Sequence, residues 1–192
     1  MARKLALTAV ALLAFAAAVS AGTLALFTDQ ATVGNNVFST STIDINASPA
    51  SAVVALAGML PGDSVTDDVV VSNAAGSAAM RYAISSAATN TDGLGLKDAL
   101  VLTVRAADVS TPASPCDDFD GTVLYTGDLD STAGAIVGSS AAGAQAGDRS
   151  LAVGASETLC FRVALPLAAT GPESATTTAT FTFDAEQTAN NA

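Results

Sequence analysis

Five aspartates form the group of side chains in this chain that is most suited to binding a ligand. Three of them precede Gly121 and two follow it, within what the sequence predicts to be one short hairpin: Asp117, Asp118, Asp120, Asp128 and Asp130. Carboxylate oxygens are the ligands that calcium prefers, and the ion needs six to eight of them. The D-x-D-x-D-G order of an EF-hand loop is absent. Two interpretations remain open, a calcium site and a plain acidic loop, and the spacing favours the loop.

The two cysteines, Cys116 and Cys160, indicate a disulfide rather than a catalytic thiol, because a lone pair in an exported chain usually becomes oxidised. The chain contains no His, which removes the H-E-x-x-H zinc motif and the Ser/His and Cys/His nucleophile pairs. Carboxylate pairs remain for acid/base work, but nothing in the sequence places two of them at a working distance. We therefore predict that the chain is not an enzyme and does not hydrolyse protein substrates. Chelator-sensitive cleavage of casein by the purified chain would overturn this prediction.

The first 25 residues have the layout of a secretory signal. The basic pair Arg3-Lys4 precedes the uncharged apolar run Leu5–Val19, and small residues then offer two cleavage sites, after Ala21 and after Ala25. A retained membrane anchor is the alternative, because the apolar stretch Leu5–Phe27 reaches the roughly 20 residues that a bilayer requires. The flanking residues favour the signal.

The acidic composition restricts the partners of the exported chain. Removal of Arg3 and Lys4 leaves five basic residues against eighteen acidic ones. Nucleic acid and anionic lipid are disfavoured, since the cationic side chains that contact phosphates are missing. A membrane is expected as a partner only through the uncleaved signal. A chain that starts at Leu26 has 167 residues, enough for one domain with a sizeable core.

The rest of the chain alternates apolar and polar residues with the period of a β-strand. The clearest strands place Leu159, Phe161 and Val163 on one face and, near the end of the chain, Phe181 and Phe183 on another. Further strands are predicted at Val37–Ile45, Val53–Leu56, Val65–Val71, Met80–Ile84 and Leu100–Arg105. Short strands with few helices and no βαβ rhythm predict an all-β fold, an antiparallel β-sandwich.

Turn chemistry separates the predicted strands. Pro61 and Gly62 occupy the centre of the segment Leu60–Asp63, which suits a type II turn because Gly accepts a positive φ. One or two short helical turns are expected within Thr91–Ala99, with Asp92 as a candidate cap. The segment Gly127–Ser156 is rich in Ala, Gly and Ser and is interpreted as a long surface loop.

Four segments, in the same order from end to end, resemble the TasA/camelysin family of secreted bacterial biofilm-matrix and cell-surface proteins. They are Gly22–Asp29, Val37–Ile45, Leu60–Asp63 leading into Val69–Asn73, and Phe181–Gln187. The resemblance implies a jelly-roll sandwich, and a SipW-type signal peptidase that cuts between Ala25 and Leu26. It implies the domain boundaries 1–25 for the signal, 26–36 for an N-terminal extended segment and 37–192 for a single sandwich domain. The cysteine pair and the Gly127–Ser156 loop depart from the family pattern.

The resemblance further implies assembly by donation of a strand, in which the freed N-terminal segment of one subunit inserts into the next. Within this segment Leu26 is the first residue, and Phe27, Ala31 and Val33 lie on one face of an extended strand, with Asp29 as the polar exception. Such a strand can bond an open sheet edge through its main chain. Gly34–Asn36 supplies a hinge. The alternative is that Leu26–Ile45 is the first strand of its own sandwich.

Two functions follow as expectations. The first is a secreted structural subunit of extracellular filaments in a biofilm matrix or on a bacterial surface. Its partners would be copies of itself in a head-to-tail polymer, the SipW-type peptidase, and a minor or anchoring subunit as a further candidate. The second is a monomeric surface adhesin or accessory binding module, which would use the Gly127–Ser156 loop. No cofactor is expected apart from the calcium considered above.

Overall fold

A computed structural model describes residues 42–50, 54, 57–107, 114–130, 134–170 and 173–191. Residues Thr40–Ala192 form one compact unit, and its described elements are nine β-strands and one short helix. The predicted all-β fold is thus confirmed. The predictions for the signal, for the cleavage site at Ala25 and Leu26, and for the donor residues Phe27, Ala31 and Val33 lie outside the described residues.

The first sheet has five antiparallel strands in the order β1-β2-β8-β4-β5. Their bounds are β1 Ile45–Ser48, β2 Ser64–Asn73, β4 Val101–Ala106, β5 Thr122–Asp128 and β8 Ser156–Ala164. The long pairing of β2 with β8, from Ser64 opposite Ala164 to Ser72 opposite Ser156, forms the middle of this sheet. Both strands carry the alternating apolar residues that the sequence predicts.

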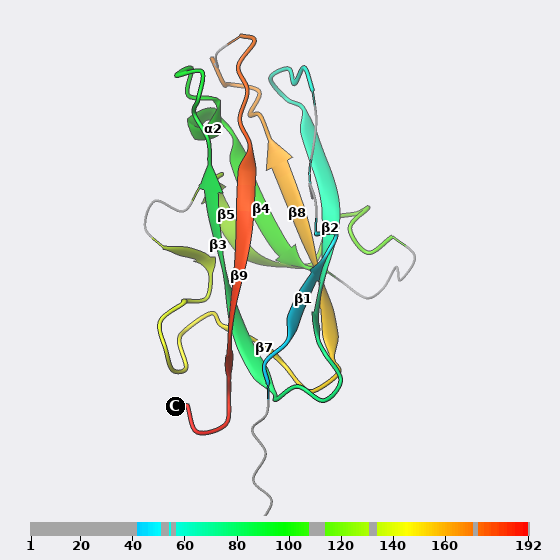
Figure 1. The fold of residues 1–192 in the computed structure, drawn as a ribbon. Coiled ribbons are helices and arrows are strands. Elements are labelled where there is room, and N and C mark those ends of the chain that lie inside the picture. Colours follow the sequence, from blue (N-terminus) through cyan, green and yellow to red (C-terminus); the bar gives the residue numbers. More distant parts are fainter. Residues whose placement is uncertain are drawn as a thin grey trace, which may run out of the picture. The chain divides into compact units, whose positions relative to one another are not determined.

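The second sheet is built around β3, Met80–Ala88, with β9, Ala179–Gln187, paired along its full length. Two short strands, β6 Ala135–Val137 and β7 Arg149–Leu151, also pair with β3. Because β9 occupies one edge of β3 throughout, β6 and β7 share the opposite edge. The path β6/β7, β3, β9 therefore leaves β9 as the last strand on its side among the described residues (Figure 1).

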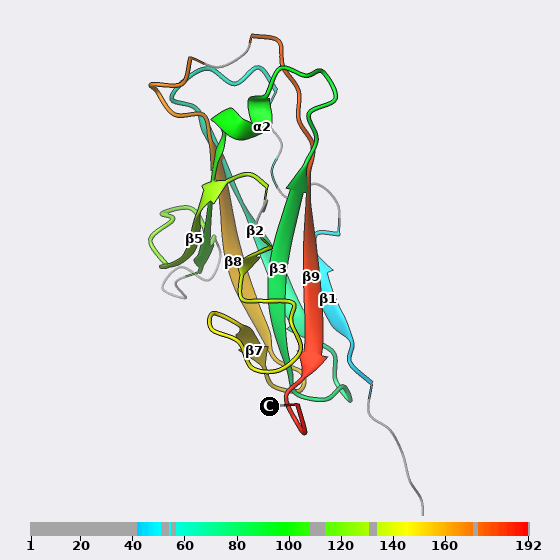
Figure 2. The same ribbon diagram turned by 90° about the vertical axis from the view of Figure 1, so that its left-hand side faces the viewer.

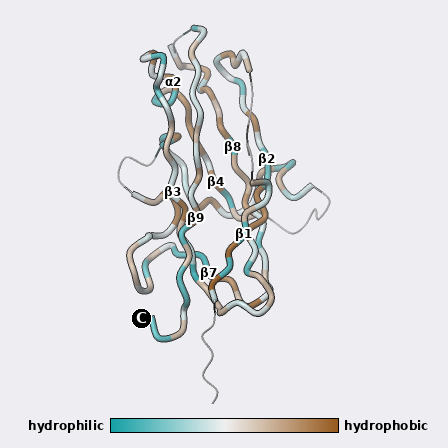
Figure 3. The backbone as a smooth tube through the Cα atoms, in the orientation of Figure 1, coloured by the Kyte–Doolittle hydropathy of each residue, from teal (hydrophilic) through white to brown (hydrophobic). Residues whose placement is uncertain are grey.

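The core lies between the two sheets, where the inward faces of their strands meet. Phe161 on β8 contacts Phe181 on β9, with ring centroids 4.8 Å apart. Fully buried residues from both sheets surround this contact: Val69, Val71, Met80, Tyr82, Ile84, Leu102, Val104 and Leu159. In Figure 3 the hydrophobic residues follow strands such as β2 and β8. The strand alternation thus fixes which face of each sheet is inside.

The two ends of the sandwich are formed by different loops (Figures 1 and 2). One end carries the helix α2, Leu96–Ala99, with the loops that lead into β2 and β9. We call it the helix end. The other end carries the turn between β2 and β3, the turn after β7, and Thr42, where the described unit begins. We call it the entry end. Backbone bonds from Ala78 N to Thr42 O (3.0 Å) and from Asn73 N to Ala155 O (2.9 Å) join its segments.

Several local predictions need correction. Within the described residues the first strand starts at Ile45, because Thr42 and Asp44 instead bond the turn at Ala74–Ala78. Val54 is not in a strand, and most of the predicted strand Val53–Leu56 lies outside the described residues. The helix has one turn and is preceded by Gly95 with φ 76°, so Asp92 is not its cap. Asp92 accepts from Leu94 N instead (3.0 Å).

The segment Gly127–Ser156 is not the long surface loop that its composition predicts. It contains β6 and β7, whose residues Ile136, Val137 and Leu151 are buried in the core. Asp148 fixes the connection between them, since its carboxylate accepts from Ser139 N (2.9 Å) and from Gln145 N (2.8 Å). Few apolar residues suffice here because Val137 and Leu151 pair directly with the central strand β3.

Candidate functional site

Two strand edges face each other on one side of the sandwich without ladder partners among the described residues. On β2, β1 pairs only with Val70–Asn73, so the outer edge of Ser64–Val69 is unpaired there. On β9, β3 occupies one edge and the other edge is unpaired. At roughly 3.3 Å per residue the free part of β2 is about 20 Å long, close to the length of an average strand. Unpaired edges are templates for a further strand.

A groove of about 1120 Å³ opens between these edges. Its floor and walls include Val65 and Val69 of β2, Val163 of β8, and Phe181 and Phe183 of β9. The ring of Phe183 packs against that of Tyr82 on β3, with ring centroids 6.2 Å apart. Because Phe181 and Phe183 are only half-buried, the groove exposes apolar surface that the sandwich would otherwise cover.

The groove is uncharged although the chain is strongly acidic. All the residues that line it are apolar or neutral, and Ala and Thr make up the wall formed by residues 175–180. Towards the helix end the lining continues over Gly58, Met59, Leu96 and Leu100. Backbone donors and acceptors of two strand edges flank this apolar floor. Such a site suits an extended peptide whose alternate side chains are mostly apolar.

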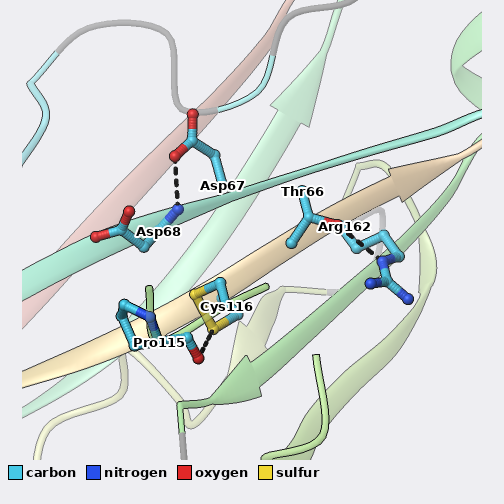
Figure 4. Close-up of a disulfide and its surroundings, with 7 residues drawn as sticks. Thr66, Asp67, Asp68, Pro115, Cys116 and Arg162 are labelled. Atoms are coloured by element: carbon cyan, nitrogen blue, oxygen red, sulfur yellow. Dashed lines mark hydrogen bonds between the residues drawn. A yellow bond between two sulfur atoms is a disulfide. The ribbon is translucent and has the colours of Figure 1, made fainter. Parts of the chain in front are cut away.

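The predicted disulfide between Cys116 and Cys160 is present, with a Cα–Cα distance of 5.4 Å (Figure 4). It fastens the segment before β5 to the outer face of the first sheet, remote from the groove lining. Beside it the guanidinium carbon of Arg162 lies 3.7 Å from the ring centroid of Phe119, and that of Arg105 lies 4.9 Å away. Thr66 accepts from Arg162 Nε (2.8 Å), which is also drawn in Figure 4. The disulfide region is therefore a packed support of the sheet.

The five aspartates proposed for calcium are not gathered at one point. Asp117, Asp118 and Asp120 precede β5, whereas Asp128 ends that seven-residue strand. Asp130 instead accepts from Lys97 Nζ at 2.9 Å. In the described part of the chain, His, Cys, Asp and Glu side chains form no group of three or more that could hold a metal ion. The geometry thus favours the plain acidic loop, and calcium binding stays a prediction without a described site.

Polar clusters outside the groove serve the fold. Glu157 accepts from Tyr82 Oη (2.6 Å) and is paired with Arg149. Burial, reinforced by Glu157, raises the pKa of Tyr82 well above its usual value, so this phenol stays protonated. On β9, the hydrogen bond from Arg81 lowers the pKa of Glu186. The Glu186 carboxylate also accepts a hydrogen bond from the backbone N–H of Gly143. These groups join strands to loops.

A family model described as "Camelysin metallo-endopeptidase" matches residues 1–94 of this sequence. The match supports the resemblance of this chain to the TasA/camelysin family. The matched part contains β1, β2 and β3, and hence the free β2 edge of the groove. No curated protein matches the chain in the sequence search. Proteins of that family are typically extracellular or attached to the surface, and the match is consistent with a secreted matrix protein.

The family description names an endopeptidase, but this chain has no His for a zinc-binding H-E-x-x-H motif. The expectation that it does not hydrolyse protein therefore remains a prediction for the casein assay. Among the described residues, no helix is long and apolar enough to cross a membrane. The groove is not predictable from the sequence, although the alternation places Phe181 and Phe183 on one face of a strand. Which strands end up at an edge depends on long-range pairing, and local alternation does not encode it.

Proposed function

We propose that this chain is a secreted structural subunit of extracellular filaments, and that its groove receives residues 26–33 of a neighbouring copy. The observation that carries the proposal is the uncharged apolar groove between two free strand edges. An inserted strand would pair its main chain with the free edge of β9 and bury alternate side chains in the groove, against β2. Phe27, Ala31 and Val33 supply the apolar side chains, and Asp29, which lies on the same face of the segment, would have to keep its carboxylate at the open, hydrated side of the groove.

The lengths of donor and acceptor agree. Eight residues extend over about 26 Å and the unpaired stretch Ser64–Val69 over about 20 Å, at roughly 3.3 Å per residue. The groove continues past Ser64 to Gly58 and Met59, which gives room for the remainder. Full burial of an apolar side chain such as Phe27 or Val33 contributes about 1.5–3 kcal/mol. Two such anchors offset much of the entropy lost on association.

Strand direction favours a neighbour's segment over the chain's own. Both β2 and β9 run from the helix end to the entry end (Figure 1). Residues before Thr42 attach at the entry end. If they turned back into their own groove, they would therefore run parallel to β2 and β9. A segment donated by a copy stacked on the helix end would run antiparallel to both strands, and antiparallel pairing is slightly more stable per residue.

The contact between donor segment and groove joins two different surfaces, so each added subunit presents a new groove. Such heterologous contacts generate filaments unless they close into a ring. Signal cleavage would control the process, since a strand can be donated only after its N-terminus is released. The adhesin alternative has no specific support, because the connection between β6 and β7 is tied to Asp148 and Glu186.

Deletion of Leu26–Val33 from the processed chain tests the proposal. We expect a monomer with an unchanged β-rich circular dichroism spectrum that sediments as a single species and forms no filaments. The control replaces the same eight residues by a Gly/Ser sequence of equal length, which keeps the chain length but removes the apolar side chains, and it should also stay monomeric. Filaments formed by either variant would refute donation by this segment.

A further inference from the structure

The two ends of the sandwich carry exposed apolar side chains that the groove does not use. At the helix end, Leu60, Leu94 and Leu167 are 69%, 48% and 82% exposed. At the entry end, Ile43 and Val153 are 39% and 53% exposed. Single exposed apolar residues are common on protein surfaces, but gathered ones mark a site of contact.

The three leucines belong to neighbouring loops that hydrogen bonds hold together. The bond from Gly62 N to Leu165 O (2.8 Å) joins the loop of Leu60 to that of Leu167. A Cβ added at Gly62 would lie 3.5 Å from Leu167 Cδ1, so these loops are in contact. Asp92 accepts from Thr176 N (2.7 Å), which ties the loop of Leu94 to the segment that leads into β9. The loops that carry the leucines are thus tied to one another or to Thr176, which lines the groove.

The entry-end residues are fixed in the same manner. Ile43 lies between Thr42 and Asp44, which are bonded to Ala78 N and Ala74 N. Val153 occupies the turn between β7 and β8, and the side chain of Asn73 donates to Ala152 O (3.1 Å) in that turn. Asn73 also donates to Ala78 O (2.9 Å). The turn of Val153 and the turn that holds Ile43 are therefore both bonded to the same buried side-chain amide.

We propose that the leucine surface of one copy, formed by Leu60, Leu94 and Leu167, seats on the entry end of the next copy against Ile43 and Val153. This inference rests on the proposed function. In an antiparallel donation, the donating copy approaches the helix end of the acceptor with its own entry end, because its N-terminal segment attaches there at Thr42. The contact between the leucine surface and the entry end would then determine how neighbouring subunits stack. The inserted strand would hold them together.

The charges beside these surfaces give the contact a characteristic salt dependence. Asp63 and Asp92 neighbour the leucines, and Asp44 neighbours Ile43. Like charges at both ends repel each other, and added salt screens that repulsion. The critical concentration for assembly should therefore fall as salt rises. A contact made of ion pairs would show the opposite trend.

The test compares the processed chain with the double variant Leu60→Ser/Leu167→Ser. Two quantities are measured, the critical concentration by pelleting and the hydrogen-exchange protection of the β9 backbone, which reports an inserted strand. We expect the variant to raise the critical concentration at least tenfold while β9 becomes protected in the filaments that still form. Val123→Ser, at a 49% exposed position on β5 away from both ends, should leave the critical concentration unchanged.

A reciprocal variant checks the opposite surface. Val153→Ser should raise the critical concentration, and its effect in combination with Leu167→Ser should be less than the product of the two separate effects if the side chains meet. If the Leu60→Ser/Leu167→Ser variant assembles at the wild-type critical concentration and its β9 backbone is protected in the filaments, the end contact is refuted. Strand donation would remain supported in that case. Absence of β9 protection in wild-type filaments would overturn strand donation and, with it, the end contact.

Discussion

A negative charge placed inside the groove should abolish assembly without unfolding the subunit. Ala179 begins β9 and lines the groove, on the same face of the strand as Phe181 and Phe183. In the free subunit its side chain is half-exposed, so a glutamate at this position can remain hydrated. Once a neighbour's strand covers the groove, the carboxylate would be buried among uncharged residues.

The expected size of the effect follows from that burial. Removing an unpaired carboxylate from water costs several kcal/mol even after relaxation of the protein. A cost of about 3 kcal/mol corresponds to a rise of more than a hundredfold in the critical concentration, since every 1.4 kcal/mol is about tenfold. The stability of the free subunit should change by less than about 0.5 kcal/mol, as for other exposed substitutions.

The matched control is Thr182→Glu, which adds the same charge to the same strand. Thr182 is exposed and does not line the groove, so this variant should assemble like the wild type. Pelleting over a concentration series measures both critical concentrations, and urea unfolding of the monomers measures both stabilities. Equal critical concentrations for Ala179→Glu and Thr182→Glu would refute the groove as the acceptor.

Three further predictions concern the subunit itself. Replacing both Cys116 and Cys160 by serine should lower stability by about 4 kcal/mol, because the disulfide closes a loop with a sequence separation of 44, and calorimetry should find Tm reduced by roughly 8–16 °C. Burial raises the pKa of Tyr82 above its ordinary value of 10.0, so its contribution to stability should be complete below pH 10 and lost as pH rises further. Tyr82→Phe should remove that alkaline loss from urea unfolding curves, while a wild-type pH dependence in this variant would assign the loss to another group. Millimolar calcium should leave Tm unchanged, and a rise of several degrees would establish a calcium site.

The fold class and the inward faces could be predicted from the sequence, because strands buried on one side impose a period of two. Leu159, Phe161 and Val163 alternate with polar residues and are indeed buried on β8. The turn at Leu60–Asp63 was also predictable from Pro61 and Gly62. Its bond from Asp63 N to Leu60 O is 2.9 Å long, and Gly62 has φ 101°.

Features that depend on long-range pairing could not be predicted. Val137 lies in a strand because it pairs with Ile84 on β3, 53 residues earlier in the chain (137 − 84). The surrounding Ala and Gly residues show no alternation. Asp92 looked like a helix cap from its position, but Gly95 starts the turn and Asp92 bonds Thr176, which lies 84 residues away. The groove arises in the same way, because β1 leaves part of the β2 edge unpaired and β9 lies at the margin of the other sheet.

The most direct test is negative-stain electron microscopy of the processed protein, with its N-terminus beginning at Leu26, concentrated from a monomeric preparation. Strand donation into the groove predicts uniform thin filaments, which should be absent when the sample carries Ala179→Glu. Isolated globular particles at every concentration of the wild-type chain would contradict a self-assembling subunit.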